Sequence, residues 1–270
     1  MSREPVSIIV PTYKEALNIP ILTRRLFDAL GRAGIPGEMI FVDDNSQDGS
    51  EKIVAELAAE FPVRIIVRTN ERGLSSAVVR GFREAKHDIL LCMDADLSHP
   101  PESVPDVIAP IAENRADFCV GSRYVAGGRT KDDWGFLRWL NSMVATLLAR
   151  PLTPVRDPMA GFFCLRRATL QVAEASGLSP IGYKIALEVM IKSRCRRVEE
   201  IPIEFSDRLH GKSKLTFRQQ VEYLQHLGRL YRFRYPALAP LLIAAFLGAM
   251  AAAVWWMFRG SADLATPAGP

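Results

Sequence analysis

The stretch VSIIVPTYKE (residues 6–15) decides the fold, because an almost continuous apolar run ends there in a short polar segment. Apolar residues that are not confined to alternate positions are typical of a strand covered on both faces. Four similar runs follow, with helical spacing of apolar residues between them. The predicted strands cover 6–10, 39–42, 63–67, 89–93 and 118–120, and the predicted helices cover 15–33, 50–60, 74–86 and 102–114. This alternation predicts an α/β fold with a mostly parallel central sheet.

Polar residues that are able to bind ligands follow three of these predicted strands. Residues 11–15 follow the first strand, residues 43–46 the second, and Asp94 and Asp96 the fourth. A helix cap or a turn would explain the polar residues after one strand, but it is a poor explanation for polar residues after all three. Because ligands bind outside the carboxyl ends of the strands in such a sheet, we expect one shared site. Two carboxylates at this spacing suit Mg²⁺ or Mn²⁺ shared with substrate phosphates, provided that a turn brings both toward one ion.

The composition excludes several other classes of protein. The 270 residues are 49% apolar and 24% charged, which rules out a disordered, a collagen-like or a fully membrane-embedded chain. The net charge of +4 is too small to indicate nucleic-acid binding. Four widely spaced cysteines lack the pattern of a zinc site and predict buried, reduced thiols. Neither a GxGxxG sequence after the first strand nor a P-loop sequence occurs, which disfavours a nicotinamide-dependent dehydrogenase.

The C-terminal part of the chain departs from this ordinary composition. Residues 236–258, PALAPLLIAAFLGAMAAAVWWMF, carry no charge and as a helix would extend about 35 Å, enough to cross a bilayer. Tyrosines precede this segment, two tryptophans close it, and lysine and arginine are more frequent before it than after it. We therefore expect a single-pass transmembrane helix, with residues 1–235 in the cytoplasm and the tail 259–270 outside.

The residues before the apolar segment also show helical spacing, over 216–235. Two interpretations stay open: a helix that lies on the inner leaflet, and a helix that packs on the globular domain. Small residues at Ala244, Gly248 and Ala252 have a spacing that would let two transmembrane helices pack as a homodimer. The predicted organisation is a domain over 1–215, an amphipathic helix over 216–235, the transmembrane helix over 236–258 and the tail. A loop is expected over 127–133.

Eight motifs occur in order along the chain: PTYKE (11–15), VDDNSQDGS (42–50), GLSSAVVRGF (73–82), MDADLSHPPE (93–102), GSRY (121–124), DPMAGFF (157–163), GYKIALEV (182–189) and RLHGKSKL (208–215). Together they resemble the dolichyl- and polyprenyl-phosphate mannosyltransferases of glycosyltransferase family 2. The resemblance implies a GT-A nucleotide-sugar-binding fold and a nucleotide-sugar donor, with GDP-mannose favoured. It also implies a divalent cation, Mg²⁺ or Mn²⁺, and a polyprenyl or dolichyl phosphate acceptor in the membrane.

The resemblance assigns roles to the residues that match these motifs. Those implied to bind the base and ribose of the donor are Pro11, Tyr13, Glu15, Val42 and Asp44. Those implied to hold the diphosphate and its metal ion are Asp94, Ala95 and Asp96, with Ser98 as a further metal ligand where some relatives have Gln. Positive charge around the donor phosphates is implied for Lys184, Arg208 and Lys214, and contact with the acceptor phosphate for Arg123, Arg138 and Ser142. The residues expected to carry the catalysis are Asp94, Asp96, Arg123 and Arg208. The first motif differs from the family's PTYNE by Lys14.

The implied reaction is an inverting displacement at the anomeric carbon of the sugar by a lipid phosphate oxygen. A phosphate monoester is mostly dianionic at pH 7 and needs no general base, so none of the histidines is assigned that role. Asp157 is expected to shape a turn or the floor of the site. Two alternatives stay open: transfer of glucose or an aminosugar from a UDP-sugar to undecaprenyl phosphate, and a non-catalytic nucleotide-binding scaffold subunit.

Overall fold

The computed structural model describes residues 4–130, 136–179, 182, 184–206, 217–237 and 240, and for 136–142 and 217–219 it describes the backbone only. The chain divides into two units, Met1–Leu227 and Gly228–Pro270. All strands of the described residues belong to the first unit, and so do the helices that pack on them.

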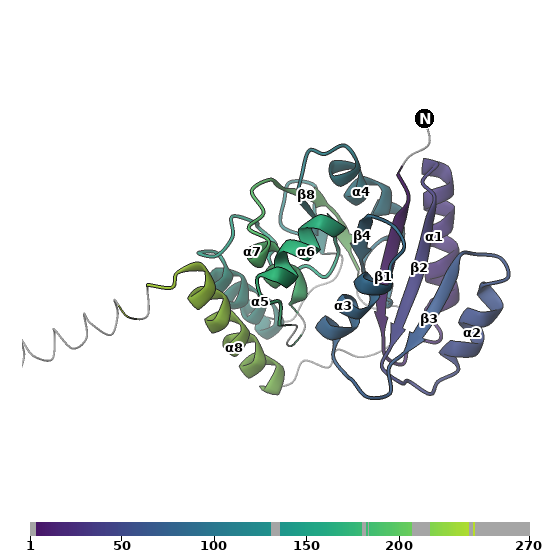
Figure 1. Cartoon of the computed structure of the whole chain (residues 1–270), viewed down its shortest axis with the longest axis horizontal. Helices are drawn as coiled ribbons and strands as arrows, with labels where there is room; N and C mark the ends of the chain where they lie inside the picture. Colours follow the sequence, from purple (N-terminus) through teal and green to yellow (C-terminus); the bar gives the residue numbers. More distant parts are fainter. Residues whose placement is uncertain are drawn as a thin grey trace, which may run out of the picture. The chain divides into compact units, whose positions relative to one another are not determined.

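A mixed sheet forms the centre of the first unit (Figure 1). Within the described residues it has seven strands in the order β3-β2-β1-β4-β7-β5-β8. All neighbouring pairs are parallel except those of β7, which runs antiparallel to both β4 and β5. The strands are β1 (Val6–Thr12), β2 (Gly37–Asp43), β3 (Val63–Val67), β4 (Ile89–Cys92), β5 (Phe118–Ser122), β7 (Phe163–Arg166) and β8 (Val198–Pro202). The predicted mostly parallel sheet is confirmed, whereas β7 and β8 were not predicted.

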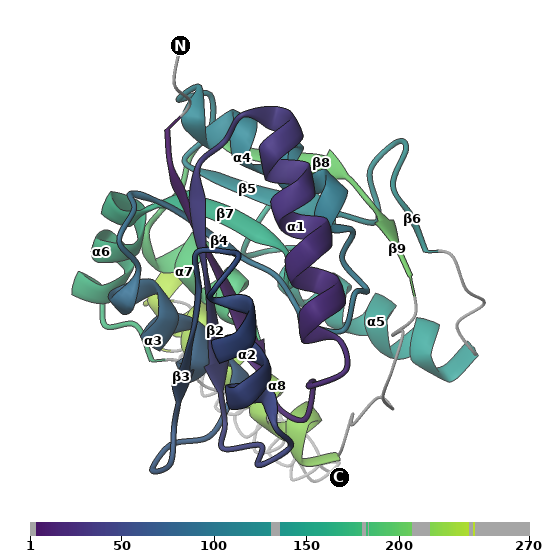
Figure 2. The same ribbon diagram turned by 90° about the vertical axis from the view of Figure 1, so that its right-hand side faces the viewer.

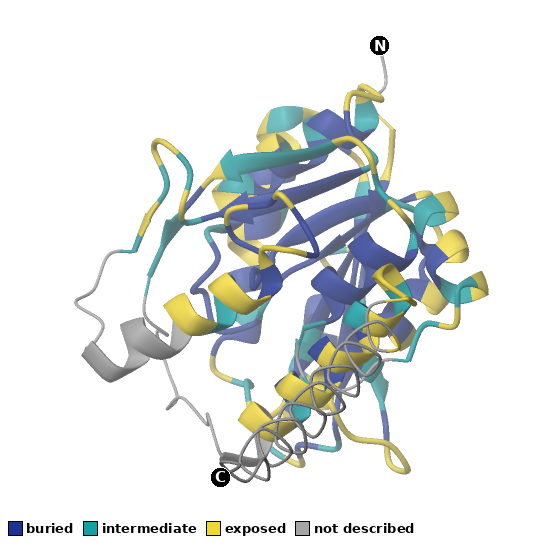
Figure 3. Ribbon diagram, turned by 90° about the vertical axis from the view of Figure 1, so that its left-hand side faces the viewer, coloured by how far each residue is buried: buried dark blue, intermediate teal, exposed yellow. Residues whose placement is uncertain are grey.

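Helices cover both faces of this sheet, so that its central strands β2, β1, β4, β7 and β5 are mostly dark blue in the burial view, whereas the edge strands β3 and β8 are mostly teal (Figures 2 and 3). One apolar cluster joins the sheet to α1, α2 and α4, and a second joins it to α3, α6 and α7. Ile8 belongs to the first cluster and Ile9 to the second, which is why the apolar run of β1 does not alternate. The helices are α1 (Ile19–Ala33), α2 (Ser50–Leu57), α3 (Leu74–Glu84), α4 (Val104–Ala112), α6 (Arg167–Ala175) and α7 (Ile185–Lys192), and a 3₁₀ turn, η1 (Pro101–Ser103), precedes α4.

A second, smaller sheet corrects one expectation from the sequence. β6 (Arg129–Thr130) pairs in parallel with β9 (Glu204–Phe205), where the sequence analysis expects only a loop. The backbone N–H of Arg129 donates to the carbonyl of Ile203 at 3.0 Å, and its guanidinium binds the Glu204 carboxylate. Arg129, whose charge suggested a solvated loop, therefore holds β6 against β9.

Two further helices are α5 (Phe136–Ala149) and α8 (Phe217–Arg234). They meet where the Tyr223 hydroxyl donates to the Ala145 carbonyl at 2.7 Å. On α8, Tyr223 and Leu227 are buried, whereas Val221 and Leu224 are 37% and 56% exposed. The apolar stripe predicted for this stretch thus packs on the first unit with one part and leaves another part in contact with solvent.

The predicted transmembrane helix falls almost entirely on residues that the structure does not describe, as do the small residues Ala244, Gly248 and Ala252. Across the described residues, no helix is both long and apolar enough to cross a bilayer. The transmembrane helix and the homodimer that it could form therefore stay predictions.

Candidate active site

The carboxyl ends of β1, β2 and β4 lie at one edge of the sheet. β1 pairs in parallel with both other strands, so Thr12 lies opposite Asp43 and Ile9 lies opposite Cys92. The pairing continues beyond β2, because the Asp44 N–H donates to the Thr12 carbonyl at 3.1 Å. The three polar strand ends that the sequence analysis expects to share a site are therefore neighbours in the structure.

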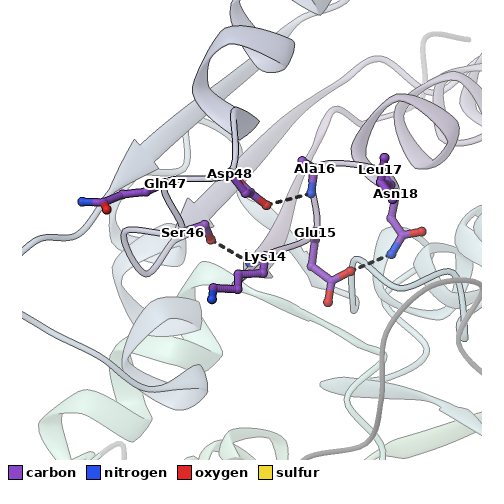
Figure 4. A pocket seen from close by; sticks show the side chains of 8 residues that line it. All are labelled: Lys14, Glu15, Ala16, Leu17, Asn18, Ser46, Gln47 and Asp48. Atoms are coloured by element: carbon purple, nitrogen blue, oxygen red, sulfur yellow. Dashed lines mark hydrogen bonds between the residues drawn. The ribbon is translucent and has the colours of Figure 1, made fainter.

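The loops after β1 and β2 enclose a pocket of about 510 Å³ (Figure 4). Two hydrogen bonds hold these loops together: the Lys14 N–H donates to Ser46 Oγ at 2.7 Å, and the Ala16 N–H donates to Asp48 Oδ2 at 3.1 Å. Carboxylate, amide, hydroxyl and ammonium groups surround the pocket and can orient a polar ligand through hydrogen bonds. The residues that line it are Lys14, Glu15, Ala16, Leu17, Asn18, Ser46, Gln47 and Asp48.

The PTYKE segment presents an aromatic ring and a carboxylate at this edge. The Tyr13 ring is 36% exposed, with the Lys14 ammonium 5.6 Å and the Arg72 guanidinium 5.3 Å from its centroid. Glu15 Oε2 accepts a hydrogen bond from Asn18 Nδ2 at 2.6 Å. Lys14 itself has a φ of 62°, a left-handed conformation that asparagine adopts more readily. The backbone at this position would thus suit asparagine better than lysine.

Asp44 is held by an arginine that the sequence analysis missed. Arg68 Nε donates to Asp44 Oδ1 at 2.8 Å, a second guanidinium nitrogen contacts the same oxygen, and the Gly73 N–H donates to Oδ2 at 2.8 Å. The side chains of Arg68 and Asp44 are 4% and 13% exposed, so this is a buried ion pair. Arg68 directly follows β3, which lies beside β2, and this position at a strand end is the signal that could have identified it.

The loop after β4 carries the two aspartates of the DxD motif. The chain bends over residues 95–97, with Leu97 in the left-handed region at a φ of 63°. Asp96 is 5% exposed, and its Oδ1 accepts hydrogen bonds from the Ser98 N–H at 3.1 Å and from Ser98 Oγ at 2.6 Å. Ser98, predicted as a metal ligand, therefore orients the Asp96 carboxylate in the structure.

Asp94 is positioned by a histidine to which the sequence analysis gives no role. The Asp94 N–H donates to His99 Nδ1 at 3.1 Å, and the imidazole stacks on Phe162 with the ring centroids 5.3 Å apart. The Asp94 side chain is 33% exposed. Gly161 faces it from the segment before β7, where a Cβ would lie 3.5 Å from both carboxylate oxygens. The absence of a side chain at Gly161 thus keeps one side of this carboxylate open.

Arg123 of the GSRY motif forms a buried ion pair with Asp157. Arg123 Nε and Nη2 donate to the two carboxylate oxygens at 2.7 and 2.8 Å, and the Arg123 N–H donates to Oδ2 at 3.1 Å. The side chains are 11% and 0% exposed, which excludes an ordinary surface pair. Burial lowers the pKa of Arg123, but the hydrogen bonds and charge of Asp157 outweigh it, so the pKa is raised on balance. Asp157 therefore fixes the guanidinium in a charged state, a larger role than the turn expected from sequence.

Lys184 contributes a second cation to the same region. Its ammonium donates to the Met159 carbonyl at 3.0 Å, two residues from Asp157 along the chain. Burial, and then the positive charge of Arg123, lower the pKa of Lys184 to about 8, although Asp157 and Asp94 act in the opposite direction. Arg123, Asp157, Asp94 and Lys184 thus lie within electrostatic range of one another.

Several predicted site residues have no described side chain. Arg208 and Lys214 lie outside the described residues, and Arg138 and Ser142 are described only as backbone of α5. Their roles stay predictions. Pro11 lies opposite Val42 near the ends of β1 and β2, and the side chains of Val42 and Ala95 are both buried.

A second pocket, of about 300 Å³, opens beside the Arg123 pair. Tyr124 links the two places, since the Arg123 guanidinium lies 5.1 Å from its ring centroid. Met143 and Leu147 of α5 are 44% and 67% exposed and form an apolar part of the wall of this pocket. Its lining residues are Tyr124, Met143, Thr146, Leu147, Arg150 and Arg156.

A mostly parallel sheet with a polar, phosphate-compatible site at its carboxyl edge, a DxD loop and buried cations defines a glycosyltransferase with a GT-A-like fold. The chain belongs to glycosyl transferase family 2, whose family model matches residues 7–172. Among solved structures, glucosyl-3-phosphoglycerate synthase from Mycobacterium tuberculosis, in complex with Mn²⁺, UDP and glucosyl-3-phosphoglycerate, superposes with a TM-score of 0.58. That match has 16% identity and covers 86% of this chain and 80% of the other, and it supports the fold alone.

Three curated relatives carry the name dolichol-phosphate mannosyltransferase. The Saccharomyces cerevisiae protein is 45% identical, and the match covers 89% of this chain and 92% of the relative. The Mycosarcoma maydis protein is 42% identical over 92% of this chain and 86% of the relative. The Pyrococcus furiosus protein is 44% identical over 84% of this chain, which spans 64% of that relative's length. The family resemblance predicted from the eight motifs is confirmed.

Proposed function

We propose that this enzyme transfers mannose, with inversion, from GDP-mannose to a dolichyl or polyprenyl phosphate. The observation that carries the proposal is the 45% identity to a dolichol-phosphate mannosyltransferase over 92% of that relative's length. The site supports it, because the PTYKE and DxD loops lie at one edge and Arg123 is held charged by Asp157. An intact, charged site of this kind disfavours a non-catalytic scaffold subunit.

A divalent cation is compatible with the DxD loop. Ser98 fixes the orientation of Asp96, and Gly161 keeps one side of Asp94 open. Among the described residues no group of three or more acidic, histidine or cysteine side chains could hold a metal ion alone. Mg²⁺ and Mn²⁺ suit such a site, because they complete their shell with phosphate oxygens and water. When bound, the cation would stabilise the negative charge that collects on the departing nucleoside diphosphate.

The residues of the chain would supply charge and placement. The lipid phosphate is already dianionic at neutral pH, so the site has no need of a general base to activate it. Arg123, together with Arg138 and Ser142, orients this phosphate and offsets its repulsion from the donor. Lys184, with Arg208 and Lys214, contacts the donor phosphates and stabilises the leaving group.

The acceptor lipid places the reaction at a membrane surface. The exposed apolar residues of α5 and the two arginines of the second pocket support contact with a lipid and its phosphate. We propose that residues 236–258 span the bilayer and that the catalytic domain lies on its cytoplasmic face, on the uncharged length and flanking charges of that segment.

The test is a panel of labelled donors offered to the full chain in vesicles that contain a polyprenyl phosphate. GDP-mannose is expected to label the lipid fraction in the presence of Mg²⁺ or Mn²⁺, whereas UDP-glucose and UDP-N-acetylglucosamine are not. Labelling from a UDP-sugar alone would overturn the donor assignment in favour of the undecaprenyl phosphate alternative.

A matched pair of variants tests the DxD loop. Asp96→Asn is expected to lower transfer by about 100-fold or more while the protein stays folded, because its carboxylate is needed near the donor phosphates. Asp28→Asn makes the same chemical change in an exposed ion pair with Arg32, and transfer should be unchanged. Near-normal turnover of Asp96→Asn would refute the proposed cation site.

A further inference from the structure

A buried charged cluster, here called the α7 junction, consists of Glu188, Lys192 and His226. Glu188 Oε1 lies 2.7 Å from the Lys192 ammonium, and Oε2 lies 3.2 Å from His226 Nε2. The three side chains are 1%, 9% and 3% exposed. Burial raises the pKa of Glu188, but its contacts with His226, Lys192 and the Ser179 N–H outweigh burial and lower the pKa on balance. The carboxylate is thus held in its charged form inside the protein.

The α7 junction also fastens the loop that leads into α7. The Ser179 N–H donates to Glu188 Oε1 at 2.8 Å, and the Lys192 ammonium donates to the Gly177 carbonyl. One carboxylate therefore joins three parts of the chain: the loop before α7, the end of α7, and α8 through His226. Because a buried charge is costly when it loses a partner, these parts are expected to keep their places together.

Lys184 stands at the point where this loop becomes helix. It is the N-cap residue of α7, and the Glu188 N–H lies 3.4 Å from its carbonyl oxygen, so the two residues are one helical turn apart. From this position the Lys184 ammonium reaches the Met159 carbonyl, on the segment that also carries Asp157. A shift of the loop or of the first turn of α7 would move the ammonium away from the site.

We propose that Glu188 is a positioning residue of the donor site: by joining the loop at 177–179 and α8 to α7, it keeps the Lys184 ammonium where it contacts the donor phosphates. The inference rests on the proposed role of Lys184 in donor binding. It also means that α8, which precedes the predicted transmembrane segment, helps to hold a donor-binding group through His226.

The test compares Glu188→Ala, Glu188→Gln, Lys184→Gln and the double variant of Glu188→Ala with Lys184→Gln, each in the full chain. Calorimetric Kd for GDP with Mn²⁺ and the KM for GDP-mannose are both expected to rise by about 10-fold or more in Glu188→Ala, because one charge-assisted phosphate contact is lost. The KM for the lipid acceptor should not change. The double variant should lose no more than Lys184→Gln alone. Glu188→Gln, which keeps an oxygen for the Ser179 N–H, should lose less than Glu188→Ala.

The control is Glu174→Gln on α6, which removes a carboxylate from a surface pair with Arg83 and should change no constant. A variant Glu188→Ala with lower stability or kcat but unchanged KM and Kd would show a purely structural role and overturn the proposal, and so would additive losses in the double variant. Where Glu188→Ala does not fold, Glu188→Gln decides by the same criteria. A wild-type chain that binds GDP but transfers no mannose refutes the proposed reaction and leaves the calorimetric comparison decisive for Glu188. Absence of GDP binding by the wild-type chain would overturn both the proposed reaction and the proposed role of Glu188.

Discussion

Gly161→Ala adds one methyl group in front of the Asp94 carboxylate. The new Cβ would lie 3.5 Å from both carboxylate oxygens and 3.5 Å from His99 Cε1, which is ordinary van der Waals contact. The backbone of Gly161 is outside the left-handed region, so alanine adopts it without strain. Because alanine has fewer unfolded conformations than glycine, the free energy of unfolding should stay equal or rise by about 0.4–1 kcal/mol.

Transfer should fall even though the fold is kept. The methyl group covers the side of a carboxylate that is 33% exposed, and it would separate Asp94 from the cation or donor. Loss of one contact to a charged group costs about 1.5–3 kcal/mol, which corresponds to about a 10- to 150-fold lower kcat/KM for GDP-mannose.

The assay is transfer of labelled mannose to polyprenyl phosphate at limiting donor, together with urea unfolding of the same preparation. Gly31→Ala on α1 is the control, because nothing lies within 4 Å of a Cβ there. It should stabilise the protein without a change in transfer. Wild-type kcat/KM in Gly161→Ala would refute the reasoning that this side of Asp94 is used, and clear destabilisation would refute the contact geometry.

Three further predictions concern other parts of the molecule. Transfer should fall as the pH rises through about 8, because Lys184 loses its proton there, and Lys184→Gln should remove this limb from a plot of kcat/KM for the donor against pH. Arg68→Met should lower the free energy of unfolding by about 3–5 kcal/mol in urea titrations, since it leaves Asp44 charged and buried. Arg24→Met breaks an exposed pair and should cost about 0–1 kcal/mol. Removal of 236–270 should release the protein from vesicles in a flotation assay while calorimetry still detects GDP binding, and continued flotation would contradict the proposed anchor.

The sheet could be predicted from sequence where strands are parallel and buried on both faces. The strands that contain Ile8, Ile40 and Leu91 place apolar residues on both faces of the sheet, so their continuous apolar runs indicate buried strands. β7 was missed because it is only four residues long and begins at Phe163, the last residue of the motif DPMAGFF, in which proline and glycine indicate a turn. β6 was missed because two residues carry too little pattern, and its partner β9 lies far along the chain.

Site residues could be predicted where they directly follow a strand. The side chains that hold those residues in place could not be predicted. The DxD loop and the PTYKE segment follow strands directly, which makes their shared edge predictable. Arg68 binds Asp44, and His226 contacts Glu188, across elements that are far apart in the sequence, and no local pattern records these contacts. Such contacts depend on which helices, strands and loops become neighbours in the fold, and a single sequence does not give this information.

The antiparallel direction of β7 has a consequence for how this enzyme could acquire new acceptors. Val120 near the end of β5 lies opposite Phe163 at the start of β7, so the chain leaves and re-enters the sheet at the same edge. The segment between these two residues, here called the excursion, includes α5 and supplies the lining of the 300 Å³ pocket, and its two ends are adjacent. The closure entropy of such an excursion grows only slowly with its length. Exchange of its middle part, α5 with the pocket that it lines, is thus a route to altered lipid preference that keeps β1, β2 and the loops that follow them.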